Sequence, residues 1–411
     1  MKICINCLLV EPGITGGGET FLVNLIARLA RLDGDNEYLL LVTQANASLF
    51  TNGNPRFSHK VIMPNALARL RRIWFENRSL PRLLKRERVD LFYSPFGTLP
   101  RSLPCKSAVT FQNLLYIDFA KNTSYRGRTL ASRLTVNLQA LYYRMTTRST
   151  LRRADKIWAV SNTTARALTD YYEVPAEKIE VIYEGVSYEQ FNPGRGAEPT
   201  VRPIDSRYLL MVSSLYPNKN IDKAISAFRK VVDRGLPHQL VIVGNDWHQY
   251  RGQLEKLISK LRLNERVKFV GGVKHDEIPA YFKHADLFLM LSNVESFGLP
   301  VLEAMAAGVP VIISQRSSLP EIAGGAALTT DIQNVNHLAD QMFRVLTDRS
   351  LAHNLRERGW SRARSFDWNE TAARAIDLFN SIAGAPGTAR NIHRKEVVGE
   401  QQSTRTPAAV R

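Results

Sequence analysis

A strand, a turn and a helix follow one another in a single segment, Asp286-Leu-Phe-Leu-Met-Leu-Ser-Asn-Val-Glu-Ser-Phe-Gly-Leu-Pro-Val-Leu-Glu-Ala-Met-Ala-Ala-Gly308. The apolar run at 287–291 predicts a buried strand, and residues 301–307 predict a helix. Pro300 suits the first helical turn, because the N–H group that proline lacks would have no partner there. The backbone N–H groups of residues 297–299 then face whatever lies off the helix start, where the helix dipole favours an anion.

Two carboxylates and one lysine accompany this turn. Glu295 closes the strand and can hold a sugar hydroxyl, and Glu303, in the first turn of the predicted helix, can accept two hydrogen bonds from a diol such as that of ribose. Alternatively, Glu303 only complements the helix dipole, which is worth about 0.3–1 kcal/mol. Lys219 follows another predicted strand and can neutralise a diphosphate, unless it is simply a solvated loop lysine.

Short apolar runs alternate with amphipathic helical patterns along the whole chain, which predicts parallel sheets covered by helices on both faces. Strands are predicted at 2–10, 38–43, 89–93, 107–111, 156–160, 179–183, 208–212, 239–243, 267–270, 286–291 and 309–313. Helices are predicted at 19–32, 221–234, 253–261, 335–347 and 368–382. Prolines and glycines between 186 and 204 interrupt the pattern.

The fold class that follows is α/β, with two Rossmann-like doubly wound domains. We expect the first domain at 1–190, a linker at 191–206, the second domain at 207–365 and a last helix at 366–382. The tail at 383–411 contains almost no bulky apolar residues, so we expect it to be disordered.

The chain of 411 residues has a net charge of +17, a field that attracts phosphates, nucleic acid or an anionic membrane face. Its three cysteines provide no disulfide framework, and Cys4 and Cys7 lie in a predicted strand, so we interpret them as core residues rather than a metal or redox site. No apolar run approaches the roughly 18 residues that a spanning helix needs. We therefore expect a soluble cytoplasmic protein.

A second glycine-containing helix start lies near the beginning of the chain, in Gly16-Gly17-Gly18-Glu19. Glycines allow backbone N–H groups to approach a phosphate closely at a helix start. The segment matches neither the dinucleotide-binding pattern nor the Walker A pattern. A plain flexible turn is an equally good interpretation.

Several segments together resemble the retaining glycosyltransferases of the GT-B fold, in particular the group typified by bacterial mannosyltransferases, family GT4. The matching segments are, in chain order, Gly16-Gly-Gly-Glu19, Ser161-Asn-Thr-Thr164, Tyr183-Glu-Gly-Val186, Phe191-Asn-Pro193, Asn218-Lys-Asn220, Val243-Gly244, Phe269-Val-Gly-Gly-Val273, the pair Glu295/Glu303, Gly308-Val-Pro-Val311 and Pro320-Glu-Ile322. They span about nine-tenths of the chain. The pair Glu295/Glu303, with Phe297-Gly-Leu-Pro300 between its members, is the sharpest element.

The resemblance implies two domains facing a cleft, with the last helix crossing back onto the first domain. It implies that a GDP- or UDP-linked sugar is the co-substrate, without a cofactor or metal, and that a glycan or polyprenyl-linked acceptor receives the sugar. The implied donor-binding residues are Gly17, Gly18, Ser214, Lys219, Val273, Glu295, Phe297, Gly298, Leu299 and Glu303. The implied catalytic residues are Glu295, Lys219 and Gln112.

The chain departs from the family pattern at two positions. Ser214 stands where the family usually has an arginine, so one phosphate contact is missing or comes from elsewhere. Gln112-Asn113 stands where the family often has His-Asp; Gln112 can bond a hydroxyl but cannot exchange a proton near neutral pH. Two alternatives stay open: a sugar-nucleotide epimerase of the same fold and, because of these departures, a catalytically weakened sugar-nucleotide-binding protein.

Basic residues gather in two parts of the first domain. Residues 119–154 contain no acidic residue, and their helical stripe is Leu130, Leu134, Leu138, Leu141 and Met145; the second cluster, residues 69–88, includes Trp74 and Phe75. One interpretation is a surface for an anionic membrane, which would make the protein peripheral on the inner face of the cell membrane. The other is a core-facing stripe with solvated arginines. Nucleic acid is disfavoured, because no known reader motif accompanies the charge.

Overall fold

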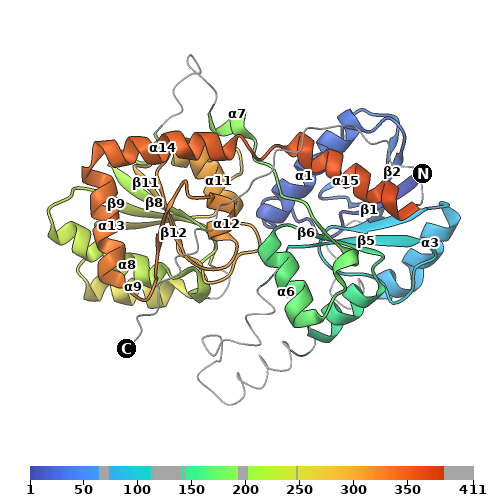
Figure 1. Ribbon diagram of the computed structural model, residues 1–411, viewed down its shortest axis with the longest axis horizontal. Coiled ribbons are helices and arrows are strands. Elements are labelled where there is room, and N and C mark those ends of the chain that lie inside the picture. Colours follow the sequence, from blue (N-terminus) through green and yellow to red (C-terminus); the bar gives the residue numbers. More distant parts are fainter. Residues whose placement is uncertain are drawn as a thin grey trace, which may run out of the picture.

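The computed structural model describes residues 1–63, 74–112, 114, 141, 144–192, 202–246 and 249–383. The chain forms two lobes, each built on a twisted parallel sheet with helices on both faces (Figure 1). The α/β fold class predicted from alternating strands and helices is therefore confirmed.

The first domain contains, within the described residues, a seven-stranded parallel sheet in the order β3-β2-β1-β4-β5-β6-β7. Its strands are β1 (Lys2–Asn6), β2 (Glu37–Thr43), β3 (Phe57–Met63), β4 (Leu91–Ser94), β5 (Lys106–Phe111), β6 (Lys156–Ala159) and β7 (Ile179–Val181). Its helices are α1 (Gly17–Leu32), α3 (Leu80–Arg86), α6 (Asn162–Tyr172) and α7 (Tyr188–Phe191).

The second domain contains six described parallel strands in the order β10-β9-β8-β11-β12-β13. They are β8 (Tyr208–Val212), β9 (Gln239–Val243), β10 (Val267–Gly271), β11 (Leu287–Met290), β12 (Val311–Ser314) and β13 (Leu328–Thr330). The helices are α8 (Ile221–Asp233), α9 (Arg251–Lys260), α10 (Ile278–Lys283), α11 (Leu299–Ala306), α12 (Leu319–Ala323), α13 (Val335–Thr347) and α14 (Arg349–Ala363).

The last helix, α15 (Trp368–Ala383), returns to the first domain and packs against α1 (Figure 1). Trp368 is buried, and its ring meets that of Phe21 from α1 with centroids 6.0 Å apart. Gly185 is needed beside it, because a Cβ atom there would lie 2.3 Å from the backbone nitrogen of Trp368. The crossover predicted for the C-terminal helix is thus present, and one hydrophobic core continues through both domains.

Several elements were not predicted. Strand β3 was missed because His59 and Lys60 interrupt its apolar residues, and it lies at the sheet edge. Helix α14 was missed because only Leu355, Gly359 and Ala363 face the core. Residues 193–201 of the predicted linker and 384–411 of the predicted disordered tail lie outside the described residues.

Burial decides two of the alternatives. Cys4 and Cys7 are completely buried in the interior of the first domain, as predicted. In contrast, Leu141 and Met145 are 52% and 64% exposed, so the core-facing interpretation is wrong for these two members of the stripe. The other members, at 130, 134 and 138, lie outside the described residues. None of the helices in the described part of the chain is long and apolar enough to cross a membrane.

Candidate functional site

The α11 turn, residues 295–299, lies between β11 and α11 and includes the first residue of the helix. Gly298 precedes the helix with φ of 101°, in the left-handed region that favours glycine. A Cβ atom at Gly298 would also lie 2.7 Å from a methyl group of Leu319. The helix begins at Leu299, two residues earlier than predicted, and Pro300 occupies its first turn as predicted.

The carbonyl groups of the α11 turn are all bonded. Ser318 Oγ lies 3.0 Å from the carbonyl oxygen of Glu295 and 2.9 Å from that of Phe297, and Ser161 Oγ donates to that of Ser296 at 2.6 Å. The backbone N–H groups of residues 297–299 have no acceptor among the described residues. This part of the turn therefore presents hydrogen-bond donors without partners, which is an arrangement that suits an anion.

Lys219 and Glu295 are brought together, as predicted. Lys219 follows β8 in a short 3₁₀ turn, and its Nζ donates to Oε1 of Glu295. The turn is held in place because Asn220 Nδ2 donates to the carbonyl of Leu291 at 2.6 Å. The two charged side chains are only 18% and 15% exposed. A cation thus stands beside the α11 turn, at the carboxyl edge of the sheet where ligands bind in α/β folds.

Glu303 lies deeper than predicted. It is the fifth residue of α11 rather than part of the first turn, and it is only 6% exposed. Burial raises the pKa of Glu303 to about 8. At neutral pH a carboxyl group with this pKa is mostly protonated, so it can both donate and accept a hydrogen bond.

A second buried carboxyl group, Glu184, was not predicted to have a role. It comes from the first domain, is 7% exposed, and has its pKa raised to about 8 by burial and by the charge of Glu303. The two carboxyl groups therefore approach each other across the domain interface. Glu184 falls within the segment 183–186, which resembles the family, and this resemblance was a signal that the residue matters. The segment did not indicate what the carboxyl group does.

Gln112 contacts the α11 turn, and Ser214 and Val273 follow strands β8 and β10 at the carboxyl edge of the second sheet. Gln112 directly follows β5, and its carbonyl accepts a hydrogen bond from Ser296 Oγ; its Nε2 is buried without a partner among the described residues. Ser214 follows β8 and is half-buried, and Val273 packs against the shared core. Asn113 lies outside the described residues.

The α1 turn, residues 13–18, belongs to the first domain. Helix α1 begins at Gly17, and the Glu19 carboxylate accepts a hydrogen bond from the N–H of Gly13 at 2.8 Å. Burial lowers the pKa of His275, and the charge of Glu19 opposes this shift. Because His275 belongs to the second domain, the turn that contains Gly17 and Gly18 faces that domain.

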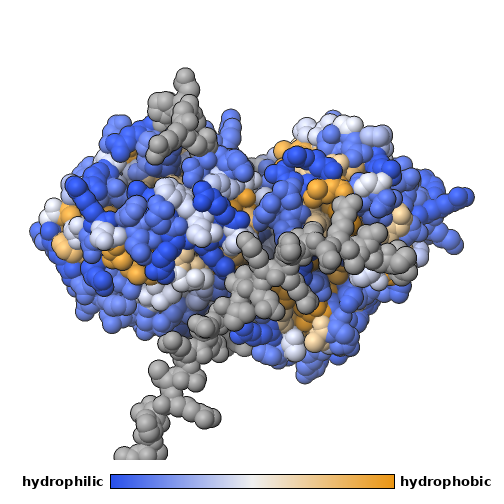
Figure 2. All heavy atoms as spheres, turned by 45° about the horizontal axis from the view of Figure 1, so that its top comes forward, coloured by the Kyte–Doolittle hydropathy of each residue, from blue (hydrophilic) through white to orange (hydrophobic). Residues whose placement is uncertain are grey.

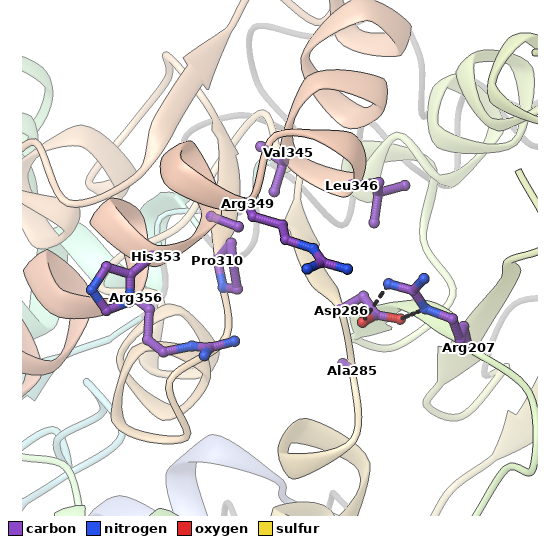
Figure 3. A pocket seen from close by; sticks show the side chains of 10 residues that line it. Arg207, Ala285, Asp286, Pro310, Val345, Leu346, Arg349, His353 and Arg356 are labelled. Carbon is purple, nitrogen blue, oxygen red and sulfur yellow. Dashed lines mark hydrogen bonds and ion pairs between the residues drawn. The ribbon is translucent and has the colours of Figure 1, made fainter.

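A pocket of about 320 Å³ lies at the opposite edge of the second sheet (Figure 3). Arg207 and Asp286, which precede β8 and β11, form an ion pair in it, and Arg349 points toward them from α14 (Figure 3). Ligands of open parallel sheets bind at the carboxyl ends of the strands, whereas this pocket lies at their amino ends. It is therefore not the candidate site. The described residues contain no group of three or more His, Cys, Asp or Glu side chains arranged to hold a metal ion.

Two facing doubly wound domains with a C-terminal helix that returns to the first one define the GT-B class. A solved structure of this class, the sucrose-phosphate synthase of Thermosynechococcus elongatus, superposes with a TM-score of 0.73 over 94% of this chain and 100% of that one, at 20% identity. Residues 15–190 match the family model "Glycosyltransferase Family 4", and residues 197–362 match "Glycosyl transferases group 1". The chain therefore belongs to the GT4 family of glycosyltransferases.

Curated relatives are similar over part of their length. The O-antigen chain mannosyltransferase B of Escherichia coli is 29% identical over 180 residues, which are 43% of this chain and 46% of the relative. A GDP-mannose-dependent alpha-(1-6)-phosphatidylinositol monomannoside mannosyltransferase of Mycobacterium tuberculosis is 32% identical over 253 residues, 56% of this chain and 64% of the relative. The similarity thus spans about half to two-thirds of these relatives.

Proposed function

We propose that this protein is a retaining glycosyltransferase that moves a hexose, most simply mannose, from a nucleoside-diphosphate sugar to a glycan or lipid-linked acceptor in surface polysaccharide synthesis. The observation that carries the proposal is the α11 turn beside Lys219, because the amides of residues 297–299 have no acceptor in the part of the chain that the structure describes. Mannose is favoured because both relatives described above are named as mannosyltransferases. GDP is favoured over UDP because one of them is named as GDP-mannose-dependent.

Each part of the donor meets a matching group in this proposal. The amides of residues 297–299 and Lys219 bind the diphosphate and stabilise the charge that develops on it as the sugar leaves. The carboxyl group of Glu303 forms hydrogen bonds with the ribose hydroxyls. Because Glu303 is buried, the two hydroxyl groups of the ribose supply the hydrogen-bond partners that water supplies to an exposed carboxyl group. Glu295, oriented by its bond to Lys219, holds a hydroxyl of the transferred sugar.

Retention and metal independence belong to the same proposal. The departing phosphate oxygen accepts the acceptor proton on the face from which it leaves, so no enzymic nucleophile is required. Lys219 and the helix start supply the positive charge that a divalent cation provides in other transferases. The Gln112 amide bonds the sugar or the acceptor but transfers no proton.

A donor screen tests this proposal. We expect GDP to raise the Tm of the protein more than UDP does, and GDP-mannose to be hydrolysed slowly without an acceptor. Turnover should be unaffected by EDTA, and anomeric analysis by NMR of the product should show retention. If no nucleoside diphosphate stabilises the protein, the proposal is wrong.

One observation favours a second candidate, a sugar-nucleotide epimerase. Glu184 and Glu303 form a buried pair of carboxyl groups with pKa values of about 8, and such groups can give and take protons near neutral pH. An epimerase exchanges a proton at the sugar carbon, whereas a transferase does not. Incubation of each donor with the protein in D₂O separates the two: deuterium in recovered sugar nucleotide supports the epimerase.

Association with an anionic membrane is a further part of the proposal. Trp74, Leu141 and Met145 are each more than half exposed in the first domain and belong to the two basic segments of the sequence, 69–88 and 119–154. Figure 2 shows hydrophobic areas among the hydrophilic surface of this domain. We expect the protein to float with vesicles that contain anionic lipid. The charge-reversed variant at Arg126, Arg128 and Arg133 should not float, and unchanged flotation would contradict this part.

A further inference from the structure

The first domain holds the α11 turn of the second domain through hydrogen bonds to Ser296. Its carbonyl oxygen accepts hydrogen bonds from Ser161 Oγ at 2.6 Å and from Thr164 Oγ1 at 3.1 Å, and its own Oγ donates to the carbonyl of Gln112. Ser161 and Thr164 are completely buried. Ser161 also caps α6, because its Oγ accepts from the N–H of Thr164. The residues at the start of α6 therefore fix one peptide group of the candidate site, the one between Ser296 and Phe297.

These hydrogen bonds to Ser296 set the direction of the N–H group of Phe297. No peptide bond in the described part of the chain is cis, so the carbonyl of Ser296 and the N–H of Phe297 point in opposite directions from the same planar group. With the carbonyl held against α6, the N–H group must point away from the first domain's helix. An unpaired amide of the α11 turn is therefore aimed by residues of the other domain.

Glu321 makes a second connection a short distance along the chain. Its carboxylate accepts five hydrogen bonds, all from the first domain: two from the backbone N–H groups of Asn162 and Thr163 (2.7 and 2.9 Å), one from each of their side chains, and one from the hydroxyl of Tyr183 at 2.9 Å. The negative charge stands at the start of α6, where the helix dipole favours it. The pKa of Tyr183, raised to about 12 by burial and by Glu321, keeps this hydroxyl protonated as a donor.

The Glu321 connection leads directly back to the α11 turn. Ser317 and Ser318, four and three residues before it, bond the backbone of Glu295, and Ser318 also bonds that of Phe297. On the other side, Arg362 donates to the carbonyls of Glu321 and Ile322, both at 2.8 Å. A displacement of Glu321 from α6 would therefore be transmitted to the α11 turn through two residues of one short loop.

We infer that Glu321 is a positioning residue: by seating its carboxylate on the start of α6, it aligns the two domains so that Ser161 and Thr164 can aim the Phe297 amide at the donor phosphate. The inference rests on the proposed function, since it assigns the α11 turn a phosphate to bind. Glu321 itself touches no substrate. Its effect passes through five hydrogen bonds to the first domain and through Ser317 and Ser318, which bond the backbone of the α11 turn.

The test substitutes Glu321 conservatively. Glu321→Gln keeps the side-chain size, but one of its two acceptor oxygens becomes an NH₂ group that faces donors of Asn162 or Thr163. We expect turnover of the donor to fall roughly 10–100-fold, the factor that the loss of a hydrogen bond to a charged group corresponds to. The KM for the donor should change by less than about threefold, because Lys219 and Glu303 remain. Glu321→Asp keeps the charge and should recover part of the turnover.

A matched control separates positioning from plain stability. Asp348 caps α14 far from the cleft by accepting from the N–H of Leu351 at 2.9 Å. Asp348→Ala therefore removes a helix-start contact of comparable kind, and should lower Tm while leaving kcat within twofold. If Asp348→Ala depresses kcat as much as Glu321→Gln does at matched Tm, or if Glu321→Gln turns over like the wild type, the inference is overturned.

Hydrogen exchange makes the inference separable from the proposed function. In the ligand-free protein, Glu321→Gln should accelerate amide exchange in the α11 turn and at the start of α6, with the core strand β9 unchanged as the internal reference. If wild-type protein binds no nucleotide, the proposed function fails and this exchange pattern decides the positioning role by itself. Unchanged exchange in both segments would overturn it, whatever the activity.

Discussion

The α1 turn and the α11 turn look alike in sequence but are built differently. Each starts a helix with a glycine at positive φ, 60° at Gly16 and 101° at Gly298. At Gly298 an added Cβ atom would meet Leu319, and the neighbouring Phe297 is only 2% exposed. At Gly16 and Gly17 an added Cβ atom would meet nothing within 4 Å. One turn is enclosed by packing, whereas the other is open at Gly16 and Gly17 and becomes packed at Gly18, where an added Cβ atom would lie 2.8 Å from a ring carbon of Phe96.

This difference indicates how a glycine-containing helix start acquires a function. In the α11 turn, serines of both domains bond the carbonyls of residues 295–297, so the amides are held in place before a ligand arrives. Preorganised donors of this kind stabilise developing charge without reorganising. In the α1 turn the restraints come from within the same segment: Thr15 Oγ1 accepts from the N–H of Glu11 at 2.7 Å, and the Glu19 carboxylate accepts from the N–H of Gly13 at 2.8 Å. We therefore expect the α11 turn to determine turnover and the α1 turn to contribute little until a ligand orders it.

The largest expected effect lies beside the α11 turn. Lys219→Ala removes the cation that neutralises the diphosphate, and we expect kcat to fall about 10²–10³-fold, the loss typical of a preorganised electrostatic contact. Lys223→Ala, four residues further along in α8 and outside the cleft, serves as the control and should change kcat by less than about twofold. Steady-state kinetics with the donor identified by the screen measures both. If kcat falls equally in both variants, the loss reflects the lower net positive charge of the protein and not the position of Lys219.

Glu295→Ala and Glu303→Ala test whether the two carboxyl groups of the site have different roles. Glu295→Ala should depress kcat, because it removes the contact to the transferred sugar and frees Lys219. Glu303→Ala should mainly weaken donor binding, because it removes the ribose contact. Isothermal titration with the nucleoside diphosphate, together with kinetics, distinguishes these patterns. Wild-type behaviour of both variants would refute the site.

The next effect compares the two turns through their stability. Gly298→Ala places a methyl group against Leu319 in the left-handed region, which should destabilise the fold by about 2–4 kcal/mol. Gly17→Ala adds a methyl group in open space at a helix start, and should change the free energy of unfolding by less than about 1 kcal/mol. Urea unfolding of the two variants measures the contrast. Equal losses would show that the α1 turn is as constrained as the α11 turn.

The enclosed parts of the molecule were also the parts that sequence could predict. Strands β8 and β9 and helix α13 have the predicted bounds, because uninterrupted apolar periodicity identifies a buried element. Strand β3 and helix α14 present fewer apolar residues and were missed. The pairing of Lys219 with Glu295 was predictable because parallel strands end at one edge of a sheet.

Roles that depend on the approach of two domains could not be predicted in this way. Glu184, Ser161 and Glu321 all lie within segments that resemble the family, yet their partners are between 119 and 159 residues away in the chain. Hydrophobic periodicity and turn residues indicate which residues are neighbours within one helix, strand or turn. They do not indicate which element of the other domain will pack against that element. The depth of Glu303 was misjudged for a related reason, since the helix start was placed two residues too late.

A pH-dependent effect lies behind the α11 turn, at Glu303. The folded-state pKa of about 8 exceeds the usual value of 4.5, so the native state binds the proton more tightly than the unfolded chain does. The protein should therefore lose stability as the pH rises from about 4.5 to about 8, at up to roughly 1.4 kcal/mol per pH unit. Glu303→Gln cannot ionise, and the Tm of this variant should fall less steeply between pH 5 and pH 8. Parallel pH profiles of Tm for variant and wild type would contradict the burial of this carboxyl group.

The smallest expected effect is at the open turn, where Glu19 acts on His275 across the cleft. Burial lowers the pKa of His275 and the Glu19 carboxylate opposes that shift, so Glu19→Gln should lower the pKa of His275 further. NMR titration of the His275 ring protons measures this change, and Glu11→Gln, at an exposed position that precedes the same turn, is the control. An unchanged pKa in Glu19→Gln would mean that the α1 turn does not face the second domain in solution, and the open turn would then have no part in the cleft. A decrease confined to Glu19→Gln would instead place both helix starts on the same cleft, one already held in its binding geometry and the other still free to adjust.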